Sequence, residues 1–273
     1  MSEAIRYAVV GNPISHSLSP AIHSRFAEQT GEPVYYERIE APTDGFEATV
    51  KAFFNAGGGG LNVTVPFKKQ AWSLVRQHTE RAATAGAVNT LWRDGDGRLH
   101  GDNTDGIGLV RDLADNHGVT LAGARILILG AGGAVRGVLG PVLATAPVCI
   151  VLANRTLNRA RHLAHEFADQ GRIESSSFEA LGRPFDVIIN GTSASLQGDL
   201  PPLPETIVGA NTVCYDMMYG AGPTAFNAWG SAKGAALTLD GLGMLVEQAA
   251  ESFHCWRGIR PRTTPVIEAL RKL

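Results

Sequence analysis

Short apolar runs that are typical of β-strands recur along the chain, and helical segments separate them. The clearest case lies within residues 124–159, where an apolar strand at 125–129 leads into a glycine-rich turn, an apolar helical segment and a second strand at 148–153. A strand, a glycine turn, a helix and a further strand make the βαβ unit of a dinucleotide-binding domain. The pattern therefore predicts a doubly wound, Rossmann-type domain in an α/β protein.

The same alternation continues on both sides of this unit. Further strands are predicted at residues 7–11, 34–39, 61–65, 185–190, 212–216 and 235–239, with a β-hairpin formed by 87–92 and 98–101. Helices are predicted at residues 19–29, 46–55, 80–85, 105–116, 159–170, 244–256 and 265–272. We expect an α/β substrate domain of residues 1–104 plus 241–273 and a dinucleotide-binding domain of residues 105–240. The two C-terminal helices should return to the first domain.

The glycine-rich turn consists of Gly130, Ala131, Gly132, Gly133 and Ala134. Glycine lets the backbone turn sharply and approach a ligand, and the free N–H groups of the following helix favour a phosphate. The match to the G-x-G-x-x-G motif is incomplete, because Val135 stands where the third glycine would be. A strand before the turn and a helix after it are the context that the motif requires. We therefore predict a dinucleotide site here rather than a turn without function.

The residues after the second strand indicate which dinucleotide binds. An NAD site usually carries an acidic residue about 20 residues after the glycines, whereas here the strand ends in Asn154, Arg155 and Thr156, with Arg159 and Arg161 close behind. Guanidinium groups suit a phosphate, and an acidic group would repel one. Arginines at a helix N-terminus oppose the helix dipole, which argues against an inert basic surface. The predicted cofactor is NADP(H).

Composition narrows the class of protein. A chain of 273 residues, with 44% hydrophobic and 18% charged residues, suits a globular enzyme with one large or two modest domains. The net charge of −2 gives no sign of a nucleic-acid or membrane surface. Cys149, Cys214 and Cys255 show neither metal-ligand spacing nor a disulfide framework, so no metal is expected. The first residues lack the apolar segment of a signal peptide, and we expect a cytoplasmic protein.

Two serines stand at the start of the first predicted helix. Ser19 precedes Pro20 and is expected to be the N-cap, with proline at the first helical position. The hydroxyls of Ser17 and Ser19 would then lie near a helix N-terminus, where the dipole favours a carboxylate. The segment alone leaves two interpretations open, a carboxylate cradle or simple caps of the helix.

Polar residues also stand at the end of the third predicted strand. Asn62 and Thr64 share one face of that strand because side chains alternate. Lys68 follows at the carboxyl end, the edge where ligands gather in open α/β sheets. Its position alone distinguishes it from an ordinary surface lysine. The polar loop at 101–106 could likewise reflect turn chemistry only.

Taken together, these segments resemble the NADP-dependent shikimate dehydrogenase family over nearly the whole chain. The motifs that carry the resemblance are GNPISHSLSP at 11–20, NVTVPFK at 62–68, GAVNT at 86–90, GDNTDG at 101–106, GAGGA at 130–134, NRT at 154–156, YDMMY at 215–219 and DGLGMLVEQA at 240–249. The departures from the family pattern are Val135 and the loop at 194–196. These departures affect the cofactor contacts and not the implied activity.

The resemblance implies NADPH-dependent, reversible reduction of 3-dehydroshikimate to shikimate in aromatic biosynthesis. It implies that Lys68 and Asp105 form the catalytic pair. It implies that Asp105 also binds the substrate, together with Ser17, Ser19, Thr64, Asn89, Tyr219 and Gln248. It implies that NADP is held by Glu80, Gly130, Ala131, Gly132, Gly133, Ala134, Asn154, Arg155, Thr156, Arg159, Met217 and Gly241. The expected partner is a small molecule, and the chain is expected to be a monomer or a homodimer.

Two other functions compete with this one. The first is a quinate/shikimate dehydrogenase that uses NAD, which an acidic residue near Arg155 would have favoured. The second is a non-catalytic protein that senses dinucleotides, since a fold does not determine a function. The presence of both Lys68 and Asp105 argues against the second alternative.

Overall fold

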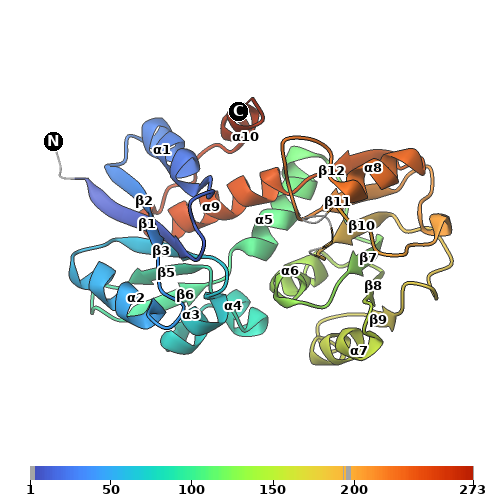
Figure 1. Ribbon diagram of the computed structural model, residues 1–273, viewed down its shortest axis with the longest axis horizontal. Helices are drawn as coiled ribbons and strands as arrows, with labels where there is room; N and C mark the ends of the chain where they lie inside the picture. Colours follow the sequence, from blue (N-terminus) through green and yellow to red (C-terminus); the bar gives the residue numbers. More distant parts are fainter. Residues whose placement is uncertain (1–3, 193, 195–197, 273) are drawn as a thin grey trace. The chain divides into compact units, whose positions relative to one another are not determined.

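The computed structural model describes residues 4–192, 194 and 198–272 (Figure 1). Ser195 and Leu196, in the loop that departs from the family pattern, lie outside the described residues. The chain divides into unit 1, Met1–Gly108 with Val246–Leu273, and unit 2, Leu109–Leu245. Most of the penultimate helix and all of the last one therefore belong to unit 1.

Unit 1 is built on a six-stranded mixed sheet with the strand order β2-β1-β3-β5-β6-β4. Its strands are β1 (Ile5–Gly11), β2 (Val34–Glu40), β3 (Gly60–Val63), β4 (Gln77–His78), β5 (Thr90–Arg93) and β6 (Leu99–Asp102). Its helices are α1 (Ser19–Thr30), α2 (Phe46–Asn55), α3 (Lys68–Leu74), α4 (Glu80–Ala85), the start of α5 (Asp105–Arg111), most of α9 (Leu242–Arg257) and α10 (Thr264–Leu270). The predicted hairpin is confirmed, because β5 and β6 pair antiparallel.

Both faces of this sheet are covered by apolar side chains, because successive residues of a strand point to opposite sides. On one face, Ala8 and Val10 of β1 pack in a core with the aromatic residues of α2. On the other face, Tyr7 and Val9 lie in a second cluster that Trp256 of α9 completes. The carboxyl ends of β1 and β3 lead into the loops with the candidate residues.

Unit 2 has a parallel six-stranded sheet with the order β9-β8-β7-β10-β11-β12, which is the 3-2-1-4-5-6 arrangement of a doubly wound fold. Its strands are β7 (Arg125–Leu129), β8 (Cys149–Ala153), β9 (Ile173–Ser176), β10 (Val187–Asn190), β11 (Val213–Asp216) and β12 (Leu237–Leu239). Its helices are α6 (Gly133–Leu143), α7 (Leu157–Glu166), α8 (Ala225–Ala232), the π-helix η1 (Asp112–Asn116) and the 3₁₀-helix η3 (Glu205–Ile207). The predicted Rossmann-type fold is confirmed. The strand order reverses between β7 and β10, which is where such sheets bind dinucleotides.

Several predicted boundaries are wrong for local reasons. The N-cap of α1 is Leu18 and not Ser19, because Pro20 sits one position further into the helix than predicted. A serine still serves the first turn, since the Ser17 hydroxyl accepts the Ser19 backbone N–H at 3.3 Å. The third strand ends at Val63, because the chain turns when the Phe67 N–H binds the Thr64 carbonyl.

Other elements have a different length or were missed. The helix predicted to end at residue 170 ends at Glu166, and the following Phe167 is buried in the core of unit 2. The helices α3 and α8 and the short strands β4 and β9 carry patterns too brief to be recognised in the sequence. In the described part of the chain, no helix combines the length and the apolar character that crossing a bilayer requires.

A buried histidine lies on the α1 side of the unit 1 sheet. The ring of His23 is fully buried and stacks on the Tyr36 ring, with 4.1 Å between the ring centroids. Within the described residues, neither ring nitrogen of His23 meets a hydrogen-bonding partner. Burial lowers the pKa of His23 to about 3, opposed in part by the neighbouring Asn62 side chain. The imidazole is therefore neutral wherever the protein is folded at ordinary pH.

This burial predicts a loss of stability in acid. The unfolded chain binds a proton at His23 near pH 6.5 and the folded chain does not, so the free energy of unfolding falls as the pH drops below 6.5. We expect this group alone to cost about 2 kcal/mol between pH 7.5 and pH 5. His23→Phe should remove that part of the pH dependence in urea unfolding. Exposed His254 offers the control, as His254→Gln. An unchanged pH dependence in His23→Phe would contradict the assignment.

Candidate active site

Lys68 and Asp105 form an ion pair in unit 1. Lys68 is the first residue of α3 and Asp105 the first of α5, and 2.6 Å separates Lys68 Nζ from Asp105 Oδ2. The lysine side chain is 30% exposed, whereas the aspartate side chain is 13% exposed. A ligand can thus reach the ammonium group while the carboxylate holds it in place. A partly exposed ammonium group of this kind is a candidate proton donor.

Asn89 links this pair to α9. Its amide nitrogen lies 2.9 Å from Asp105 Oδ1, 2.9 Å from Thr104 Oγ1 and 3.2 Å from Gln248 Oε1. The side-chain oxygen of Asn89 accepts the Thr104 backbone N–H at 2.9 Å. The structure therefore brings four predicted residues into one hydrogen-bonded group: Lys68, Asp105, Asn89 and Gln248.

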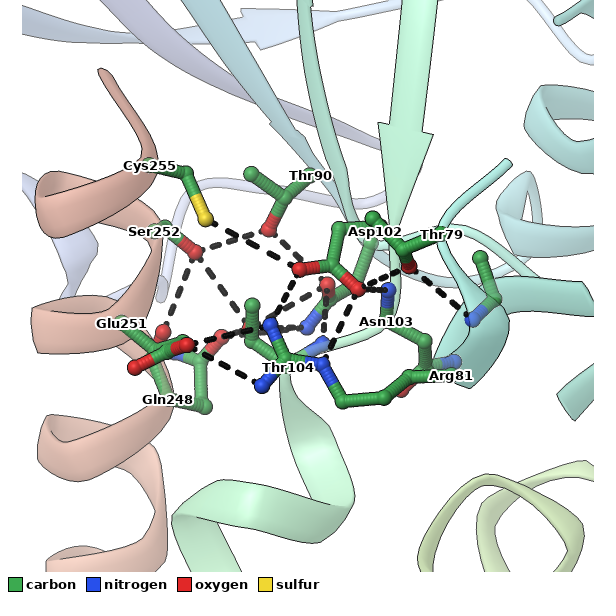
Figure 2. A network of polar contacts seen from close by, with 12 residues as sticks. Thr79, Arg81, Thr90, Asp102, Asn103, Thr104, Gln248, Glu251, Ser252 and Cys255 are labelled. Carbon is green, nitrogen blue, oxygen red and sulfur yellow. Dashed lines mark hydrogen bonds and ion pairs between the residues drawn. The ribbon is translucent and has the colours of Figure 1, made fainter. Parts of the chain in front are cut away.

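A buried cluster of charged side chains adjoins this group (Figure 2). Asp102, at the end of β6, is 1% exposed, and both of its carboxylate oxygens accept hydrogen bonds from the guanidinium of Arg81 on α4. Arg81 also donates to Glu251 on α9 at 3.0 Å, and Arg260 pairs with the same glutamate. Burial alone would lower the pKa of Arg81, but the two carboxylates raise it further above its usual range.

This cluster determines where Asp105 begins its helix. The Asp102 carboxylate accepts the backbone N–H of Asn103 at 2.7 Å, and the Asn103 side-chain oxygen accepts the backbone N–H of Asp105 at 3.2 Å. On α9, Glu251 lies one turn after Gln248 and on the same side of the helix. Arg81 thereby ties the loop that carries Asp105 to the helix that carries Gln248, as Figure 2 shows.

Ser17 and Ser19 lie together at the start of α1. Their hydroxyl oxygens are 3.2 Å apart. The Tyr36 hydroxyl interacts with the Ser19 side chain and donates to Asn62 Oδ1 at 2.7 Å. Asn62 in turn donates to the backbone carbonyl oxygen of Asn89 at 3.2 Å. A continuous set of polar contacts therefore leads from the serine pair to the Lys68–Asp105 group.

In unit 2, the glycine turn has the form that a dinucleotide needs. Gly130 has a φ of +107°, and a side chain at either Gly132 or Gly133 would meet open space. These two residues precede and begin α6, so the backbone there is open to a phosphate. Val135 fits in place of the third glycine because it packs against Gly191, where any Cβ would lie 2.5 Å from the valine methyl. The residues present thus fit an NADP pyrophosphate.

The predicted phosphate-binding residues follow β8 at the same edge. Asn154 Nδ2 donates to the Thr156 carbonyl at 2.9 Å, and the Arg159 backbone N–H binds the same carbonyl at 3.0 Å. Arg155 and Arg159 are exposed, and within the described residues neither forms an ion pair. Two free guanidinium groups beside a braced turn are available to a ribose phosphate.

Met217 and Gly241 also lie together in unit 2. A Cβ on Gly241 would stand 2.2 Å from the Met217 carbonyl oxygen, so only glycine permits this approach. The buried side chains of Asn190 and Asp216 brace the two neighbouring loops. Asn190 accepts the Thr192 backbone N–H at 3.1 Å, and Asp216 accepts the Met218 backbone N–H at 3.0 Å.

Three further predicted residues lie on other elements. Thr64 follows β3 at the carboxyl edge of the unit 1 sheet. Tyr219 belongs to unit 2, its side chain is 37% exposed, and partial burial raises its pKa. Glu80 is the exposed first residue of α4 in unit 1, whereas the other predicted cofactor residues belong to unit 2.

Sequence reasoning missed the residues that support the site. They are Arg81, Asp102, Thr104 and Ser252, whose hydroxyl lies 2.7 Å from that of Thr90. Asp102 and Thr104 stand inside the GDNTDG motif, and Ser252 follows Gln248 by one helical turn, so all three positions carried a signal. Arg81 had none, because an arginine in a short helix looks like any surface residue. Cys255, whose thiol contacts Asp102, is also part of the cluster, and burial raises its pKa to about 12.

Known families match three segments of the chain. The shikimate dehydrogenase substrate binding domain matches residues 9–91, the shikimate / quinate 5-dehydrogenase family matches 112–197, and the shikimate 5′-dehydrogenase C-terminal domain matches 241–271. The first and third matches fall mainly in unit 1, and the second falls in unit 2.

Individual relatives agree with these matches. The shikimate dehydrogenase (NADP(+)) of Alkalilimnicola ehrlichii is 61% identical, over 97% of this chain and 98% of the relative. The shikimate 5-dehydrogenase of Thermus thermophilus, solved in complex with NADP(H) and shikimate, is 33% identical with a TM-score of 0.88, over 98% of this chain and 99% of that one. The 5-ketofructose reductase of a Gluconobacter strain is 27% identical with a TM-score of 0.90, over 100% and 99% of the two chains.

The Arg81 cluster generates a prediction for stability. Arg81→Met leaves Asp102, 1% exposed, without its cation, and we expect the free energy of unfolding to fall by about 3–5 kcal/mol. The matched control is Arg98→Met, because the Arg98 side chain is 65% exposed and its ion pair with Asp96 lies at the surface. That variant should change stability by less than about 1 kcal/mol. Urea unfolding of the two variants measures the difference, and equal midpoints would disprove the role given to Arg81.

Proposed function

The chain belongs to the shikimate dehydrogenase family, and on that premise we propose that it catalyses the reversible, NADPH-dependent reduction of 3-dehydroshikimate to shikimate. The observation that carries this proposal is the Lys68–Asp105 pair, held by Asn89 at the end of the GDNTDG and GAVNT motifs. We assign substrate binding to residues 1–104 and 241–273, which correspond closely to unit 1. We assign NADP binding to residues 105–240, which correspond closely to unit 2.

The substrate is bound by groups that match its polar pattern. Ser17 and Ser19 hold the carboxylate, because two hydroxyl donors lie side by side at the start of α1. Asn89 and Asp105 hold ring hydroxyls, since an amide and a carboxylate offer both donors and acceptors. Thr64, Tyr219 and Gln248 complete the set of substrate contacts.

Lys68 moves the proton. When NADPH is bound, it supplies the hydride that reduces the ketone carbon. Negative charge then grows on the ketone oxygen, and the Lys68 ammonium stabilises that charge and donates its proton. In the oxidising direction, neutral Lys68 accepts the proton of the hydroxyl. Asp105 orients Lys68 through the 2.6 Å contact between them.

The residues that would hold NADP divide into backbone and side-chain contacts. The open glycine turn from Gly130 to Ala134 accommodates the pyrophosphate. Arg155, with Asn154, Thr156 and Arg159, binds the 2′-phosphate. Met217 and Gly241 line the same site, and Glu80 is a further proposed contact. A cytoplasmic location and a monomeric or homodimeric state belong to this proposal as well.

One assay tests the function directly. NADPH and 3-dehydroshikimate are added to the protein, and oxidation of the nicotinamide is followed by its absorbance. Turnover with NADPH and little with NADH supports the proposal. Comparable oxidation of quinate with NAD would instead identify the alternative dehydrogenase, and binding of NADPH without turnover would identify a sensing protein.

Lys68→Ala tests the proton transfer. We expect kcat to fall by ~10²–10⁴-fold, the usual contribution of a general acid–base group. Substrate KM should change much less, and NADP affinity hardly at all, because Lys68 belongs to unit 1. Neighbouring Lys69, which is exposed, supplies the control as Lys69→Ala. A near-normal kcat in Lys68→Ala would remove this lysine from the mechanism.

Arg155→Ala tests the cofactor preference. Loss of a charge-assisted contact should weaken NADP binding by about 1.5–3 kcal/mol and leave NAD binding nearly unchanged. The control is Arg183→Ala, which removes another exposed positive charge from unit 2. Dissociation constants for both dinucleotides give the comparison. If the two cofactors lose affinity equally, Arg155 does not bind the phosphate.

A further inference from the structure

Arg38 on β2 lies against the serine pair of the carboxylate site. Its Nε and Nη2 atoms donate to the Ser17 carbonyl oxygen at 3.0 Å and 2.6 Å. Arg38 forms no ion pair with a carboxylate anywhere in the described part of the chain, not even with Glu40 two residues further along the strand. A guanidinium group is thus held in place beside the serines while its charge remains uncompensated.

The strand β2 braces both serines. Tyr36 and Arg38 are two residues apart and therefore on the same face of β2. Tyr36 interacts with the Ser19 side chain, and Arg38 binds the Ser17 backbone. The register of one strand therefore places an aromatic hydroxyl at one serine and a positive charge at the other.

A carboxylate bound at Ser17 and Ser19 needs a positively charged group nearby. The hydroxyls of Ser17 and Ser19 are neutral donors, and the charge of Lys68 is balanced by Asp105 at 2.6 Å. A carboxylate that leaves water for two neutral hydroxyls loses hydration without gaining a counter-charge. The unpaired guanidinium of Arg38, bound to the backbone carbonyl of Ser17, supplies that counter-charge through space.

We propose that Arg38 is a specificity-determining residue that makes the site favour an anionic acid over a neutral analogue of the same shape. The inference rests on the proposed function, in which Ser17 and Ser19 bind the carboxylate. The fold itself does not require an acid, because a chain with a TM-score of 0.90 to this one is named as a reductase of 5-ketofructose, an uncharged sugar. Selection for the acid must therefore come from particular side chains.

The test compares shikimate with its neutral methyl ester. Dissociation constants for both are measured by titration calorimetry, which needs no turnover. We expect the unsubstituted protein to bind the acid more tightly. Arg38→Met should weaken binding of shikimate by ~5–30-fold and binding of the ester by less than ~2-fold. Added salt should narrow the difference between acid and ester in the unsubstituted protein more than in Arg38→Met.

Two further variants make the comparison specific. Arg38→Lys keeps the charge and loses the paired donors, so it should retain most of the preference for the acid. Arg25→Met removes the same charge from unit 1 at a residue whose guanidinium, among the described residues, binds just the Ala21 carbonyl of its own helix, so it should leave both ligands unaffected. NADP affinity should be the same in all variants.

The outcomes separate this inference from the proposed function. Equal losses for acid and ester in Arg38→Met would show that Arg38 acts only by holding Ser17, and would overturn the inference. A lack of preference for the acid in the unsubstituted protein would overturn it too. If the protein binds the acid through Arg38 but does not oxidise it, the proposed activity fails while the role of Arg38 stands.

Discussion

The carboxylate of Asp102 is 1% exposed, and a buried charge is tolerated only when a counter-charge and hydrogen bonds compensate it. Arg81 provides the counter-charge and extends the compensation to Glu251 on α9. Since Asp102 also binds the backbone of Asn103, this requirement determines the path of the loop that presents Asp105. The position of Asp105 beside Lys68 therefore depends on a neighbouring ionic cluster.

The two units build their sites in different ways. In unit 1, side chains carry the site, and polar contacts run from Ser19 through Tyr36, Asn62 and Asn89 to Asp105. Each group is oriented by the next, which suits a small substrate with a fixed pattern of hydroxyls. In unit 2, the candidate site is formed mainly by the backbone. The open glycine turn needs no side chain, and the exposed arginines need only remain unpaired to receive a phosphate.

Predictions from sequence gave the correct bounds where the local residue pattern alone determines a helix or a strand. The strand at 125–129 and the helix Phe46–Asn55 have the predicted bounds, because their periodicity and flanking glycines agree. They failed where neighbours decide. The N-cap of α1 is Leu18 and not the predicted Ser19, because the Ser17 hydroxyl serves the first turn from outside the helix. The short helix α3 had no periodic signal at all, although it carries Lys68.

By itself, the sequence determined the α/β class, the dinucleotide turn and the motifs of the candidate site, because these follow from residue spacing along the chain. It also placed Lys68 and Asp105 at the ends of predicted elements. Only the tertiary structure brought Lys68 to 2.6 Å from Asp105 and revealed Arg81 and Arg38 as partners of the site. The physical reason is that an ion pair depends on distance in space. Residues 37 positions apart approach each other only when the sheet and its helices have packed.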